Sequence, residues 1–99
     1  MSEPRTFEEA VDLVLADMRR VMIERQRKYG PDNIRMFGEK GVVIRCHDKL
    51  ARLAHFHFGG GTDASDESID DSWIDTGNYA AIALMLRRGW WGLPLSDEI

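Results

Sequence analysis

Four polar residues in the last third of the chain have types and spacing suited to chemistry. Glu67, Asp71, Asp75 and Asn78 follow one another at intervals of four, four and three residues. In a helix these intervals place all four within about one-quarter of the circumference. Neighbouring carboxylates repel one another, so a bound cation stabilises such a stripe, and oxygen ligands of this kind suit Mg²⁺. The alternative is a solvated acidic face near a helix N-terminus, where the helix dipole favours acids.

A second group of charged residues precedes this stripe in the sequence. Arg45, Asp48, Lys49 and Arg52 share one face of a predicted helix. If that face met the acidic stripe, Asp48 would add a metal ligand, and Lys49 and Arg52 would bind phosphate oxygens. The alternative is ordinary surface charge with local ion pairs. An aromatic residue beside the stripe, Trp73 or Tyr79, is a candidate for stacking on a planar ligand.

The sequence does not favour a zinc site, a nucleophilic cysteine or a glycine-rich phosphate-binding loop. The three histidines, His47, His55 and His57, cannot share one helical face, which argues against zinc. Cys46 lies on an apolar face, so we expect it to be packed rather than nucleophilic. The triple glycine 59–61 is not followed by the Lys-Ser/Thr pair of a phosphate-binding loop.

Three helices are predicted to position these residues. Apolar residues at helical spacing predict helices over 7–28, 42–58 and 66–88. Thr6 is placed to cap the first helix, with Glu9 completing a capping box, and Ser65 or Asp66 is placed to cap the third. Between them we expect a loop over 34–41 and a flexible glycine-rich connector over 59–65.

The apolar faces predict how these helices pack. One face of the second helix and one stripe of the third are expected to be buried; their members are Val43, Cys46, Leu50, Leu53 and Ala54, then Ile69, Trp73, Thr76, Ala80, Ala83 and Leu86. We also expect Trp90, Trp91 and Leu93 to be largely buried, by the bundle or by a second chain. The sequence therefore predicts one all-α domain over 1–99, an antiparallel helical bundle of three main helices completed by oligomerisation.

Composition narrows the classes of partner. The 99 residues carry a formal net charge of −4, which argues against general nucleic-acid binding. The charge is segregated, with ten Lys and Arg against four acids between Arg19 and Arg52, and six acids without a base between Asp63 and Asp75. Since no apolar run approaches the roughly 20 residues of a membrane span, and no signal peptide or cysteine pair is present, we expect a cytoplasmic protein without a membrane partner.

Several separated motifs, taken in order, resemble the nucleotide modification associated domain 1 family. They are Lys28-Tyr29-Gly30, Asp32-Asn33-Ile34, 41–45, 48–53, Glu67-Ser68-Ile69, and Asp71 and Asp75 followed by Asn78-Tyr79-Ala80. This family is common in bacteriophages and is regarded as a relative of the all-α, MazG-like nucleoside triphosphate pyrophosphohydrolases. The resemblance covers about residues 24–86, and the combination of motifs is more specific than any one of them.

The resemblance implies a function in nucleotide metabolism. It implies a homo-oligomer, a dimer or tetramer, that binds a nucleotide polyphosphate through Mg²⁺ and basic residues and releases pyrophosphate by attack of a metal-activated water. Glu67, Asp71, Asp75 and Asp48 would hold the metal, with Asp71 and Asp75 as the catalytic carboxylates. The remaining matched positions would bind the substrate: Lys49, Arg52, Arg45 and Lys28 its phosphates, Asn78 and Tyr79 its nucleoside.

One departure keeps a second hypothesis open. MazG-like enzymes carry a Glu-x-x-Glu pair on one helix, and this chain has none, so its second helix supplies only Asp48. The alternative to a hydrolase is therefore a non-catalytic phage protein that binds or sequesters a nucleotide, or one that blocks a host protein. In the bacterial host of a phage, either protein would be cytoplasmic.

Overall fold

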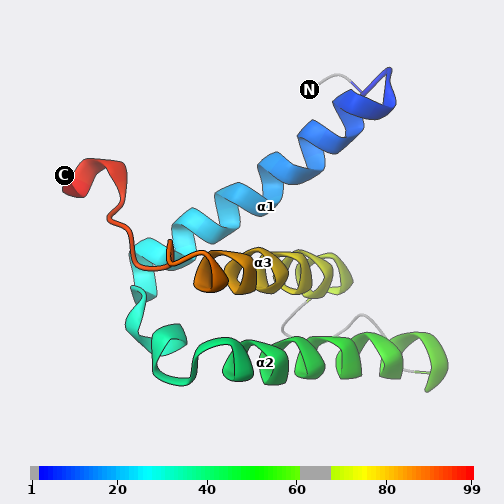
Figure 1. Cartoon of the computed structure of the whole chain (residues 1–99). Helices are drawn as coiled ribbons and strands as arrows, with labels where there is room; N and C mark the ends of the chain where they lie inside the picture. The colour runs from blue at the N-terminus through cyan, green and yellow to red at the C-terminus, as the bar shows by residue number, and fades with distance from the viewer. Residues whose placement is uncertain (1–2, 61–67) are drawn as a thin grey trace.

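The computed structural model describes residues 3–60 and 68–99 and confirms the all-helical architecture. Helix α1 spans Phe7–Tyr29, α2 spans Asp32–Phe58 and α3 spans Ile69–Arg87, followed by a short 3₁₀ helix, Ser96–Glu98. Helices α2 and α3 run antiparallel along one another, and α1 crosses them so that only its second half lies against α3 (Figure 1). Of the helices in this part of the chain, none combines the length and apolar composition that a bilayer crossing requires.

Helix α1 begins where the sequence predicts. The hydroxyl of Thr6 accepts a hydrogen bond from the backbone N–H of Glu9 at 3.1 Å, as an N-cap residue should. The Glu9 carboxylate accepts the backbone N–H of Arg5 at 2.7 Å, one residue earlier than in a standard capping box. At the other end, Gly30 takes a φ of 71°, and its N–H donates to the carbonyl of Gln26. Pro31 then separates α1 from α2.

The expected loop over 34–41 is wrong, because this segment belongs to α2. The helix starts at Asp32 and continues through a kink at Gly38, whose φ of 61° and ψ of −147° are open almost only to glycine. Directly after the kink, the carboxylate of Glu39 is bound by Arg87 of α3 at 3.1 Å, which ties this part of α2 to the end of α3. The glycines that suggested a loop therefore mark a bend inside a helix.

Helix α3 begins later than predicted. The hydroxyl of Ser68 accepts the backbone N–H of Asp71 at 3.0 Å, so Ser68 is the N-cap in place of Ser65 or Asp66. The predicted helical residues 66–67, and the connector beyond residue 60, lie outside the described residues. Asp71, Asp75 and Asn78 do lie on this helix as expected.

The buried faces of α2 and α3 differ from the predicted ones. In α3 the buried residues are Ser72, Asp75, Asn78 and Ile82, whereas Trp73 and Ala80 of the expected apolar stripe are exposed. In α2 the buried residues are Val42 and Leu53, with Lys49 close to buried, whereas Val43, Leu50 and Ala54 are exposed. The inward face of α3 therefore carries Asp75 and Asn78 of the predicted polar stripe, and Lys49 of α2 lies against it.

The carboxyl-terminal segment is only partly buried by its own chain. Trp90 and Leu93 are 52% and 66% exposed, so the expectation that the bundle buries them is wrong, and their burial by a second chain stays a prediction. Trp91 is half-buried, and its indole N–H donates to the carbonyl of Pro31 at 3.0 Å. An ion pair of 2.8 Å between Asp97 and Arg27 also attaches this segment to α1. The segment thus closes over the junction of α1 and α2.

Candidate functional site

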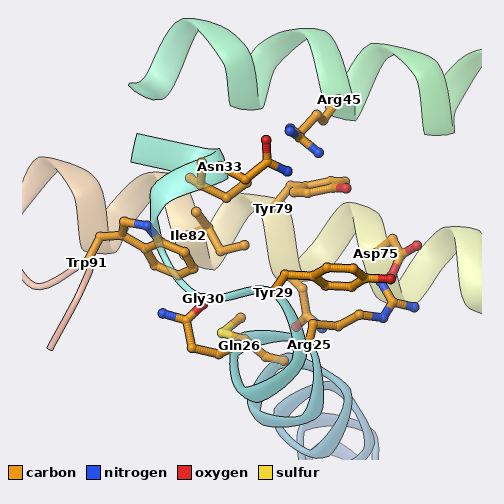
Figure 2. Close-up of a pocket in the computed structure, with 13 residues that line it drawn as sticks. Arg25, Gln26, Tyr29, Gly30, Asn33, Arg45, Asp75, Tyr79, Ile82 and Trp91 are labelled. Carbon is orange, nitrogen blue, oxygen red and sulfur yellow. The ribbon is translucent and has the colours of Figure 1, made fainter. Parts of the chain in front are cut away.

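A pocket of about 210 Å³ opens where α1, α2, α3 and the carboxyl-terminal segment meet. Helix α1 contributes Arg25, Gln26 and Tyr29, and the start of α2 contributes Asn33. The rest of the lining includes residues from further along α2, from α3 and from the terminal segment: Arg45, Asp75, Asn78, Tyr79, Ile82 and Trp91. Four separate parts of the chain therefore build one site (Figure 2).

The carboxylate of Asp75 forms ion pairs with cations from two other helices. Its side chain is 7% exposed, its Oδ1 lies 3.2 Å from Nη1 of Arg25, and its Oδ2 lies 3.1 Å from Nζ of Lys49. Helix α3 holds it between a cation from α1 and a cation from α2. Because burying a lone carboxylate would be costly, this pairing explains how an acid occupies the inward face of α3.

Asn78 lies about one turn further along α3 and is also buried. Its amide nitrogen donates to the backbone carbonyl of Met18 at 3.0 Å, which fixes the amide plane against α1. Gly77, next to it, has no side chain at the point where the Met18 side chain packs, so α1 and α3 approach closely here. The hydrogen bond of Asn78 and the close packing at Gly77 therefore fix α1 against α3 beside the pocket.

Arg45 is the pocket cation without a partner in the described part of the chain. It is half-buried on α2, and none of residues 3–60 and 68–99 forms an ion pair or hydrogen bond with it. Arg25, in contrast, is bound to Asp75. Two arginines against one carboxylate give the lining residues a net positive charge in a protein whose formal net charge is −4. An anion is thus the ligand favoured by this pocket.

Three aromatic residues line the pocket: Tyr29, Tyr79 and Trp91. In Figure 2, Trp91 lies at one end, the pair Arg25 and Asp75 lies at the other, and Tyr29 and Tyr79 lie between them. Aromatic rings at such an opening offer flat apolar surfaces to a planar ligand. The pocket therefore has an ion pair at one end, an indole at the other, and two further aromatic rings along its lining.

The structure brings together half of the predicted substrate-binding residues. Arg45, Asn78 and Tyr79 line the pocket, and so does Asp75 from the predicted metal set. Lys49 does not line the pocket, but it forms an ion pair with Asp75, which does. Lys28, Asp48, Arg52 and Asp71 are exposed residues outside the lining, and Lys28 lies over the ring of Tyr29 at 5.2 Å.

The predicted magnesium site is not formed by the described residues alone. Among residues 3–60 and 68–99, no three His, Cys, Asp or Glu side chains gather in a group able to hold a metal ion. Both oxygens of Asp75 are bound by cations, which compete directly with a metal. Glu67 lies outside the described residues, so the set of Glu67, Asp71, Asp75 and Asp48 stays a prediction.

Some residues of the site were not among the predicted ones. Arg25, Gln26 and Trp91 were not predicted, although Arg25 and Tyr29 share a helical face through their spacing of four. Tyr29 and Asn33 had a signal, because both fall within motifs that carry the family resemblance. Cys46 is partly buried as expected, and burial raises the pKa of its thiol above the usual range, which disfavours the nucleophilic thiolate.

The chain was compared with known proteins at three levels. No family model, no curated protein and no solved structure matches it.

Proposed function

We propose that this protein binds a nucleotide, a phosphorylated ligand with a planar ring, in the pocket between α1, α2, α3 and the carboxyl-terminal segment. The proposal rests on the guanidinium of Arg45, which has no partner among residues 3–60 and 68–99, in a pocket that also holds three aromatic side chains. A guanidinium binds phosphate oxygens through paired N–H groups, and an aromatic ring stacks on a base. A nucleotide contains both kinds of partner in one molecule.

The polar groups of the pocket support the same ligand class. Gln26 and Asn33 bring side-chain amides to the lining, and each amide offers both donors and an acceptor. Asn78 uses one of its N–H groups on the carbonyl of Met18, which fixes its orientation before any ligand arrives. Preorganised amides of this kind recognise the edges of bases and the hydroxyls of sugars.

The size of the pocket indicates how a nucleotide would be held. A volume of about 210 Å³ is below the roughly 300 Å³ at which typical small-molecule sites begin. We therefore expect the pocket to enclose the ring and part of the sugar, and the phosphates to remain at the open side, within reach of arginine.

Binding is better supported than turnover. The hydrolysis implied by the family resemblance needs carboxylates that are available to Mg²⁺. The one buried carboxylate of the described pocket, Asp75, is bound at Oδ1 and at Oδ2 by cations of this chain. We accordingly favour the non-catalytic hypothesis, nucleotide binding or sequestration. Pyrophosphate release and inhibition of a host protein remain predictions from the sequence.

Calorimetric titration tests the proposal. Nucleoside mono-, di- and triphosphates are titrated into the protein in the presence of a chelator, which removes any contribution of divalent metal. Wild type should bind at least one of them, and Arg45→Gln should weaken binding by about tenfold or more, since hydrogen bonds to a charged group contribute about 1.5–3 kcal/mol.

Arg19→Gln is the matched control, because Arg19 is an exposed arginine of α1 that does not line the pocket. Its affinity should stay within about twofold of wild type. The absence of binding by every nucleotide, or an equal loss in both variants, would contradict the proposal.

A further inference from the structure

Arg25 of α1 uses only one of its side-chain N–H groups within the described part of the chain. Its Nη1 donates to Oδ1 of Asp75 at 3.2 Å. A guanidinium carries five N–H donors, and no other group among residues 3–60 and 68–99 accepts a hydrogen bond from this one. The Arg25 side chain is 52% exposed and lines the pocket. It can therefore bind a ligand without giving up its contact with Asp75.

The contact with Asp75 fixes the place of the Arg25 guanidinium. An exposed arginine without such a contact samples many rotamers, and a ligand that binds it must order it at a cost in free energy. The Asp75 carboxylate is itself held in place, because it is buried and its Oδ2 is bound by Lys49 at 3.1 Å. Figure 2 shows the Arg25 side chain reaching from α1 to this carboxylate. The guanidinium is thus oriented before any ligand arrives.

Arg25 and Arg45 are the cations of the described pocket lining, and they come from different helices. The nearby arginines Arg27 and Arg35 do not line it, and each is paired with an acid, Asp97 at 2.8 Å and Asp32 at 3.2 Å. A phosphate dianion presents three terminal oxygens, whereas one guanidinium fork binds two. A phosphorylated ligand therefore has acceptors left for Arg25 once Arg45 is bound.

The negative charge of Asp75 has an effect opposite to that of its contact with Arg25. A carboxylate in the pocket lining repels a phosphate, so on charge alone its removal should strengthen the binding of an anion. Lys49 and Arg25 would keep their positive charges. If the carboxylate acts by orienting Arg25, its removal should instead weaken binding. The sign of the change separates the two effects.

We propose that Arg25 is a second phosphate-binding residue of this pocket, beside Arg45, and that Asp75 is the residue that positions it. This inference rests on the nucleotide-binding function proposed above and assigns a role in it to the buried carboxylate. Asp75 then acts on the ligand through an arginine of its own chain, to which it is bound at Oδ1.

A double-mutant cycle measured by calorimetry, in the presence of a chelator, tests the proposal. The probes are the nucleotide that binds wild type most tightly, among the mono-, di- and triphosphates, and the unphosphorylated nucleoside of the same base. Arg25→Gln should weaken binding of the nucleotide by about tenfold and change that of the nucleoside by less than about twofold. Asp75→Asn should weaken binding of the nucleotide by about threefold or more.

The second half of the cycle isolates the positioning role. In the Arg25→Gln background, Asp75→Asn should weaken nucleotide binding no further, because no arginine is left to orient. Asp71→Asn is the matched control, since it removes the same charge from an exposed position on α3 outside the pocket lining. Its nucleotide affinity should stay within about twofold of wild type.

Three results would overturn the inference while leaving nucleotide binding intact. They are an Arg25→Gln protein that binds the nucleotide as tightly as wild type, an Asp75→Asn protein that binds it more tightly, and an equal loss on Asp75→Asn with and without Arg25. A wild type that binds no nucleotide would instead contradict the proposed function itself, and this inference with it.

NMR of the Arg25 side chain in wild type gives an independent test should Asp75→Asn fail to fold. The guanidinium N–H signals, assigned by their loss in Arg25→Gln, should be those of a restrained group in the free protein, because Asp75 limits rotation of the guanidinium. They should shift on addition of the nucleotide and not of the nucleoside. Signals of a freely rotating guanidinium in the free protein, or signals that the nucleotide leaves unchanged, would also overturn the inference.

Discussion

The ammonium of Lys49 on α2 lies 3.1 Å from Oδ2 of Asp75 on α3, at a point where the lysine side chain is 19% exposed and the aspartate side chain 7%. A nearly buried lysine and a buried aspartate thus join the two helices that pack most extensively. Arg25 of α1 binds the other oxygen of the same carboxylate at 3.2 Å. One side chain therefore connects all three helices, and it also lines the pocket.

Replacement of Asp75 by asparagine should destabilise the fold. Asp75→Asn keeps the shape of the side chain but leaves Lys49 and Arg25 without their carboxylate. Since Arg25 is half exposed, we expect a loss of about 2 kcal/mol rather than the larger cost of a fully buried pair. Urea unfolding measures the change. Asp71→Asn, an exposed acid on the same helix, should cost no more than about 0.5 kcal/mol. Equal stabilities of the two variants would refute the role given to Asp75.

Gly38 should be intolerant of any side chain. An added Cβ at this position would meet no atom within 4 Å, so Gly38→Ala creates no clash and tests the backbone alone. Its φ of 61° and ψ of −147° should make alanine cost about 2 kcal/mol in the free energy of unfolding. Lys40→Ala, at an exposed helical position just after the kink, should change stability by less than about 0.5 kcal/mol. A Gly38→Ala protein as stable as wild type would mean that the kink is absent in solution.

The sequence predicted the helices better than it predicted their faces. Apolar spacing located α1 and most of α2 and α3, and the Thr6 cap was correct because capping depends on residues close in sequence. The inward face of α3 was wrong because Asp75 is stabilised by Arg25, 50 residues away, and by Lys49 on another helix. No pattern within one helix reveals such partners, and a hydropathy argument assigns a lone carboxylate to solvent.

Only part of the site was predictable, because some of its residues meet through contacts between distant parts of the chain. Arg45, Asn78 and Tyr79 were identified through residue type and the family resemblance. Trp91 reaches the pocket through a hydrogen bond to Pro31, 60 residues earlier in the chain, and that contact depends on the path of the terminal segment. Residue spacing carries no information about such a path.

Trp91 should report ligand binding by its fluorescence. Its half-buried indole lies at one end of the pocket, so a base that stacks there should change its emission. Trp91→Phe should abolish the response to nucleotide, whereas Trp90→Phe should retain it, because Trp90 is 52% exposed and does not line the pocket. Loss of the response in Trp90→Phe alone would place the ligand elsewhere.

Magnesium should contribute little to nucleotide affinity. Because both oxygens of Asp75 are bound by cations, Mg²⁺ should change the dissociation constant by less than about threefold. The check is titration with and without the metal, followed by chromatography of the nucleotides after prolonged incubation, in which they should be recovered intact. Release of pyrophosphate by wild type but not by a folded Asp75→Asn protein would instead support the metal-dependent hydrolase.

Nucleotide binding in this pocket is tested most directly by locating the bound nucleotide in a ¹H–¹⁵N NMR titration in the presence of a chelator. The largest shift changes should fall on the backbone amides of Gln26, Tyr29, Gly30 and Asn33 and on the indole N–H of Trp91, all of which belong to the pocket. A spectrum that no nucleotide changes, or changes confined to residues outside the pocket, would contradict nucleotide binding at this site.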